Sequence, residues 1–104
     1  MQKIYIAGKM TGEENYRQKF KAAQDELEAR GYRAMNPAIL PPGFDYEDYM
    51  RICFAMIEAC DAVYMLDNWQ DSPGAMREHE YAGATGKGII YAKGGDKAGR
   101  ETAP

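Results

Sequence analysis

Residues 62–78 read AVYMLDNWQDSPGAMRE, and this stretch decides the fold. It opens with an apolar run that is typical of a buried strand. Ser72 then suits the N-cap of a helix, and Pro73 suits the first helical position, where a missing N–H costs nothing. A strand followed directly by a helix is the repeating unit of α/β folds, so the stretch predicts a parallel sheet.

One acidic residue on this helix is notable for its place. Glu78 falls on the second turn, near the edge where parallel strands end and helices begin. Ligands bind at that edge in open α/β sheets, and Gly74 would let a ligand approach the backbone closely. A carboxylate there can act as a base, a nucleophile or a hydroxyl-binding group. By charge alone, Glu78 would instead be a solvated helix residue.

The rest of the chain repeats the same unit. Short apolar runs predict strands at residues 4–7, 32–35, 62–66 and 88–92. Between these strands, apolar residues recur at helical spacing and predict three helices. The first begins with a capping box of Thr11 and Glu14, the second has a cap at Asp45, and the third starts at Pro73. With right-handed crossovers, this order predicts an α/β fold: a three-layer flavodoxin-like sandwich with a four-stranded parallel sheet, order 2-1-3-4, and helices on both faces. We expect residues 1–92 to form a single domain and residues 93–104 a flexible tail.

The composition describes an ordinary globular domain of 104 residues. Its net charge is −3, without a basic block, which gives nucleic-acid binding no electrostatic support. Cys53 and Cys60 lie on one predicted helix, about 10 Å apart at a rise of ~1.5 Å per residue, so a disulfide is excluded and buried thiols in a reducing compartment are favoured. No zinc pattern, signal peptide or membrane span is evident, and we expect a cytoplasmic protein without metal or organic cofactor.

In the strand order 2-1-3-4, the loops at residues 8–12 and 67–74 face each other across one crevice. The first loop, Gly8 to Gly12, reads either as a nest for phosphate or as an ordinary turn between strand and helix. Tyr5, on the first strand, either points its hydroxyl into the crevice beside Glu78 or simply packs.

Two further aromatic residues, Trp69 and His79, lie in or near the second of these loops in the sequence. Trp69, together with Asp67, could cover a flat base, although a lone tryptophan more often packs. We assign His79 to the core or to an interface. The loop at residues 37–45, with three prolines, is long enough to line a site.

Several motifs follow one another along the chain: Ile4-Tyr5-Ile6-Ala7-Gly8, Asp61-Ala62-Val63, Ser72-x-Gly74-x-x-x-Glu78, Tyr81-Ala82 and Gly86-Lys87. In this order they resemble the nucleoside 2-deoxyribosyltransferase superfamily. The resemblance covers residues 3–92 and is closest to a branch of small phage- or prophage-type domains of undetermined function, the DUF4406-like branch.

The resemblance implies roles for individual residues. Glu78 would be the nucleophile on C1′ of the sugar, and Tyr5 would hydrogen-bond its carboxylate. Ser72 is similar to the serine that holds phosphate in the branch that hydrolyses deoxynucleoside monophosphates. The expected substrate-binding set is Gly8, Met10, Thr11, Gly12, Asp67, Trp69, Ser72 and Gly74.

The chain departs from the superfamily pattern at two positions. Cys53 stands where the superfamily usually has an aspartate that assists the sugar or the departing base. Asp45 and Asp48 could substitute for it only if the loop turns them inward. Glu80 stands where transferases tend to carry glycine.

The sequence therefore predicts an N-glycosidic bond hydrolase or transferase acting on a (deoxy)nucleoside or nucleoside 5′-monophosphate. The alternatives are a nucleotide-binding or sequestering module without turnover, which Cys53 favours, a glycohydrolase of a nicotinamide or ADP-ribose compound, and a structural protein-binding role. The resemblance also implies a homo-oligomer, a dimer or tetramer. An apolar surface patch for it could come from Met50, Met56, Met76, Tyr46 and Tyr49.

Overall fold

A computed structural model describes residues 2–92 of the chain. The elements are β1 (Lys3–Ala7), α1 (Tyr16–Ala29), β2 (Arg33–Met35), a 3₁₀ turn at Pro37–Ile39, α2 (Tyr46–Glu58), β3 (Ala62–Met65), a 3₁₀ turn at Trp69–Asp71, α3 (Pro73–Ala84) and β4 (Gly88–Tyr91). The sheet order β2-β1-β3-β4, with every pair parallel, confirms the prediction. The tail predicted at residues 93–104 lies outside the described residues.

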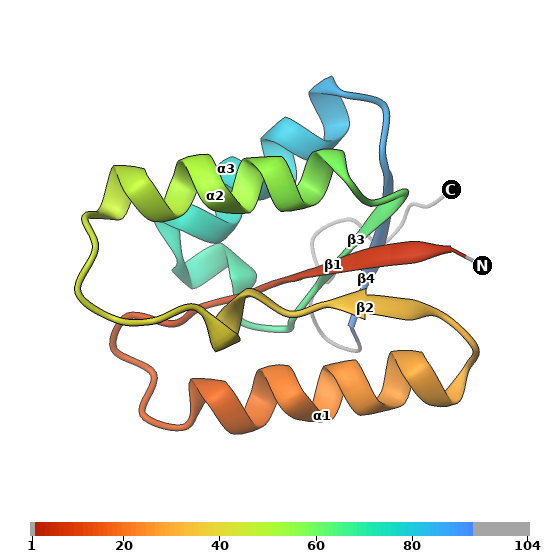
Figure 1. Cartoon of the computed structure of the whole chain (residues 1–104), viewed down its shortest axis with the longest axis horizontal. Coiled ribbons are helices and arrows are strands. Elements are labelled where there is room, and N and C mark those ends of the chain that lie inside the picture. The colour runs from red at the N-terminus through yellow and green to blue at the C-terminus, as the bar shows by residue number, and fades with distance from the viewer. Residues whose placement is uncertain (1, 93–104) are drawn as a thin grey trace.

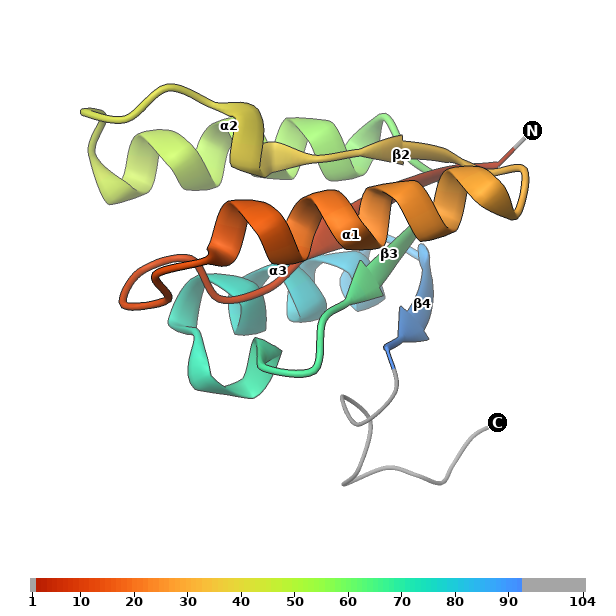
Figure 2. The ribbon, with the colours of Figure 1, turned by 90° about the horizontal axis from the view of Figure 1, so that it is seen from below.

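The elements form three layers, as predicted. Helix α1 covers one face of the sheet, and α2 and α3 cover the other (Figure 1; Figure 2). The loops that follow β1, β2 and β3 gather at one end of the sheet, where α2 and α3 also begin (Figure 1). No helix within residues 2–92 has the length and apolar character needed to cross a bilayer.

Strand β1 is the centre of the core because both of its faces are covered. Ile4 and Ile6 pack on the α1 side, whereas Tyr5 and Ala7 pack on the side of α2 and α3. All four are buried, as expected for a strand inside a parallel sheet. The alternation of side chains along a strand therefore places the hydroxyl of Tyr5 on the face that α3 covers.

The start of the first helix differs from the prediction. Helix α1 begins at Tyr16, with Asn15 as its N-cap, so the capping box predicted for Thr11 and Glu14 is wrong. Gly12 has φ +81°, in the left-handed region, which a right-handed helix cannot contain. The chain instead turns here, and the carbonyl of Met10 accepts a hydrogen bond from the Glu13 N–H at 3.1 Å.

The buried face of α2 differs from the prediction at Met50, which was expected in a surface patch. Met50, Cys53 and Ile57 are its buried residues, with the spacing of one helix face. Met50 is therefore buried at 4% exposure and cannot belong to a surface patch, whereas Ile52 is 39% exposed. Asp45 caps this helix as predicted, and its N–H donates to the Asp48 carboxylate at 3.2 Å.

Two glycines give a matched test of this packing. A Cβ on Gly8 would lie 2.7 Å from Cδ1 and 3.0 Å from Cβ of Leu66, which is buried, whereas a Cβ on Gly83 in α3 would meet nothing within 4 Å. Gly8→Ala should lower the free energy of unfolding by about 1–3 kcal/mol through overpacking. Gly83→Ala should raise it by about 0.5–1 kcal/mol. Urea unfolding measures both, and a Gly8→Ala variant as stable as the parent protein would contradict this packing.

Candidate active site

A cavity of about 470 Å³ opens where β1 ends, at the edge of the sheet predicted for a ligand. Its volume lies in the range of small-molecule sites. Residues 8–11, 37–38, 40–44 and 71–75 line it, together with side chains from β1, α1, α2 and α3. The structure thus brings the first loop and the start of α3 to one cavity, as the strand order predicts.

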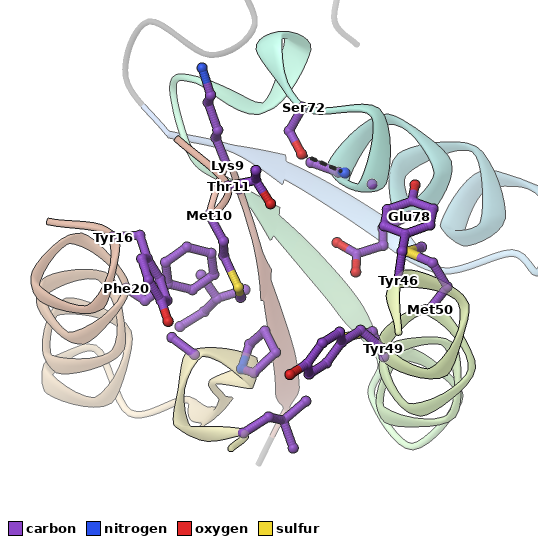
Figure 3. A pocket seen from close by; sticks show the side chains of 18 of the residues that line it. Lys9, Met10, Thr11, Tyr16, Phe20, Tyr46, Tyr49, Met50, Ser72 and Glu78 are labelled. Atoms are coloured by element: carbon purple, nitrogen blue, oxygen red, sulfur yellow. Dashed lines mark hydrogen bonds between the residues drawn. The ribbon is translucent and has the colours of Figure 1, made fainter. Parts of the chain in front are cut away.

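The carboxylate of Glu78 points into this cavity (Figure 3). Glu78 is only 7% exposed, and it lies between Ala75 and Ala82 on the buried face of α3. These two small residues let the helix lie close to the sheet. The hydroxyl of Tyr5 donates to Oε2 of Glu78 at 2.8 Å, which confirms their predicted proximity.

Burial controls the protonation of this pair. It raises the pKa of Glu78 to about 7, against the opposing effect of hydrogen bonds from Tyr5 and Cys53. Burial, and then the charge of Glu78, also holds the pKa of Tyr5 well above its ordinary value. The phenol therefore keeps its proton and donates it in the hydrogen bond, which favours the ionised form of Glu78.

Cys53 completes the immediate surroundings of Glu78 from the side of α2. The thiol lines the cavity, is buried, and is hydrogen-bonded to Glu78. Burial, and then the charge of Glu78, raises the pKa of Cys53 to about 12. Asp45 and Asp48 do not take its place, because neither lines the cavity and Asp48 binds the Asp45 N–H and Arg51.

Ser72 and Gly74 lie at the start of α3, on the cavity wall. The hydroxyl oxygen of Ser72 accepts a hydrogen bond from the Ala75 N–H at 3.0 Å, so Ser72 is the predicted N-cap. A Cβ on Gly74 would lie 3.5 Å from the Met50 sulfur and 3.6 Å from the Tyr46 ring, which are ordinary contacts. The backbone at Gly74 is therefore approached by these two side chains.

The first loop contributes less of its backbone than a phosphate nest requires. Gly8, Met10 and Thr11 line the cavity, whereas Gly12 does not. The N–H of Lys9 donates to Oδ1 of Asn68 at 3.1 Å and is occupied. Figure 3 shows Thr11 at the end of β1, with its hydroxyl toward the cavity. Thr11 and Lys9 are the polar side chains that this loop contributes to the cavity lining.

Asp67 and Trp69 do not lie where the sequence predicted. Neither lines the cavity; Asp67 is exposed and Trp69 is buried at 9% exposure. The 3₁₀ turn at Trp69–Asp71 folds the indole onto His79 of α3, with ring centroids 4.2 Å apart and planes 20° apart. His79, half-buried, also lies 2.7 Å from the hydroxyl of Tyr91. The prediction that Trp69 covers a base is therefore wrong.

Apolar side chains form one wall of the cavity, and the loop at residues 37–45, predicted to line a site, supplies part of it. The wall consists of Tyr16, Phe20, Pro37, Leu40, Pro41, Pro42, Phe44, Tyr46, Tyr49 and Met50. The hydroxyl of Tyr49 donates to the Pro41 carbonyl at 2.7 Å and accepts from the Phe44 N–H at 3.2 Å, which fixes the loop over the cavity. The prolines at residues 37–45 were the signal for the loop, whereas the wall residues on α1 and α2 were not predicted to line a site.

The comparisons with known proteins agree with this architecture. The structure is similar to that of a 2-desoxiribosyltransferase from Leishmania mexicana, with a TM-score of 0.70 and 21% sequence identity. The match covers 88% of this chain and 63% of that one, so the chain spans less than two thirds of that protein. This likeness shows a shared α/β fold.

A family model described as "Domain of unknown function (DUF4406)" matches residues 2–91. The chain belongs to this family. No curated protein matches the chain. Among the described residues, no group of three or more histidine, cysteine, aspartate or glutamate side chains is arranged to hold a metal ion.

The buried carboxyl predicts how stability depends on pH. The pKa of Glu78 rises from 4.5 to about 7 on folding, so between these values the folded chain binds more protons than the unfolded chain. Stability should therefore fall as pH rises, by roughly 3 kcal/mol between about pH 4.5 and pH 8. Glu78→Gln should lack this loss. Urea unfolding of both proteins across the range measures the difference, and a difference that stays constant with pH would contradict the assignment.

Proposed function

We propose that the chain cleaves or transfers the N-glycosidic bond of a (deoxy)nucleoside or nucleoside 5′-monophosphate, acting through one domain at residues 1–92. The observation that carries this proposal is the buried carboxylate of Glu78, which faces a cavity of about 470 Å³ and accepts a hydrogen bond from Tyr5. The fold shared with a protein titled a deoxyribosyltransferase supports the same class of reaction.

The chemistry uses Glu78 as the nucleophile. Breaking the bond between C1′ and the base develops oxocarbenium charge on the sugar, and a carboxylate beside the ring stabilises or captures that charge. Water then completes hydrolysis, or a second base completes transfer. Tyr5 orients the carboxylate through the 2.8 Å hydrogen bond and favours its ionised form.

A 5′-phosphate has a suitable place at the start of α3. Ser72 and Gly74 line the cavity at this helix N-terminus, where the helix dipole favours negative charge. The hydroxyl of Thr11 faces the same cavity from the first loop (Figure 3). The apolar wall on the side of residues 37–44 would then receive the base.

A nucleotide-binding module without turnover is the second candidate. Cys53 favours it, because the thiol beside Glu78 has a pKa of about 12 and is a poor proton donor at neutral pH.

A homo-oligomer stays a prediction from the resemblance. Tyr46 and Met76 are exposed apolar side chains that a partner subunit could cover.

Removing the nucleophile should abolish turnover. Glu78→Gln should reduce the release of free base from a panel of nucleosides and monophosphates by at least about 1,000-fold. Tyr5→Phe should reduce it by about 10- to 100-fold, because it removes one hydrogen bond to a charged group. Chromatography of the free base measures both rates.

The matched control is Glu80→Gln, which removes an exposed carboxylate from the same helix and should leave the rate unchanged. If the parent protein releases no more base than Glu78→Gln across the panel, the enzymatic proposal fails. Calorimetric binding of a monophosphate without release would then favour the binding module.

A substitution at Ser72 separates helix capping from phosphate binding. Ser72→Asp should keep the stability of the protein, because aspartate caps helices as well as serine does. Its negative charge should repel a 5′-phosphate, so the affinity for monophosphates should fall at least about tenfold more than the affinity for nucleosides. Calorimetry measures both affinities, and equal losses would show that no phosphate lies at Ser72.

A further inference from the structure

Glu78 faces the cavity, but the two groups that contact its carboxylate, Tyr5 and Cys53, are poorly suited to protonate a departing base. Among the described residues that line it, two groups contact the Glu78 carboxylate, and both bind protons tightly. Tyr5 donates to Glu78 at 2.8 Å, with a pKa well above its ordinary value. Cys53 has a pKa of about 12. Neither group is a suitable general acid near neutral pH.

Three further polar side chains of the cavity, those of Lys9, Tyr49 and Asp71, are no better placed. Lys9 extends its ammonium group away from Glu78 (Figure 3). The hydroxyl of Tyr49 already donates to the Pro41 carbonyl at 2.7 Å. Asp71 is exposed and lies beside Ser72, next to the proposed phosphate position. A neutral base would therefore have to leave without a proton from these residues.

The immediate surroundings of Glu78 add a second argument. Glu78 is a buried carboxylate, and the residues that contact its carboxylate, Tyr5 and Cys53, are uncharged donors. A ligand with positive charge would supply the missing partner. Tyr16, Phe20 and Tyr49 border the cavity away from Glu78 (Figure 3), and aromatic rings attract cations.

We propose that the preferred substrates are N-glycosides whose base carries a fixed positive charge, namely pyridinium or N7-alkylated purine nucleotides. This inference rests on the proposed function and specifies its substrate class. Such a base leaves as a neutral molecule and needs no proton from the protein. The two kinds of base share the same chemistry, and the cavity walls favour neither.

The proposed step balances without any other reactant except water. The C1′–N bond breaks, and its electron pair passes to the ring nitrogen and neutralises the cationic base. An oxygen of Glu78 forms a bond to C1′. Water then attacks C1′, the Glu78 carboxylate leaves, and one proton is released to solvent.

Matched substrate pairs test the inference. Guanosine 5′-monophosphate is compared with 7-methylguanosine 5′-monophosphate, and reduced with oxidised nicotinamide mononucleotide, the purine pair also in its 2′-deoxy form. Each rate is divided by the rate with Glu78→Gln, which corrects for the lability of the substrate. We expect kcat/KM to be at least about 100-fold higher for the cationic members, the scale of general acid catalysis.

Each outcome decides the matter. A preference for the cationic member in either pair supports the inference and identifies which kind of base the site takes. Equal or faster release from the neutral members overturns the inference while leaving the proposed function intact. No release above Glu78→Gln from any member overturns both.

Discussion

The structure depends on one constraint, the buried carboxylate of Glu78, for which residues 2–92 supply no cationic partner. Glu78 occupies a position between two alanines where a helix normally places apolar side chains against a sheet. Tyr5 and Cys53 are uncharged, and their hydrogen bonds compensate only part of the lost hydration of Glu78. The pKa of Glu78 therefore remains raised. A fold that keeps such a group accepts lower stability and holds a carboxylate that faces a confined cavity.

The sequence predicted those features that depend on the spacing of apolar residues and on the topology of the sheet. The apolar runs and the cap at Ser72 place α3 after β3, and the right-handed crossover rule then gives the sheet order that the structure shows. Because parallel strands end at one edge, the order also brings β1 and α3 together. The contact between Tyr5 and Glu78 follows from this placement.

Features that depend on local turns could not be predicted in this way. Thr11 and Glu14 match a capping box, but the left-handed conformation of Gly12 keeps them outside the helix. Trp69 looked available for a ligand, but a 3₁₀ turn stacks it on His79. The aromatic residues of the cavity wall follow the spacing of ordinary core residues, so periodicity alone cannot separate a cavity wall from a core.

The two hydrogen bonds of the Tyr49 hydroxyl have a consequence for how this scaffold can diversify. They attach the proline-rich loop to α2, while Tyr5 and Glu78 are carried by β1 and α3. The loop and the proposed reaction centre are thus held by different parts of the backbone. Descendants of this chain could exchange the loop for a new one and acquire other specificities, with the old chemistry preserved.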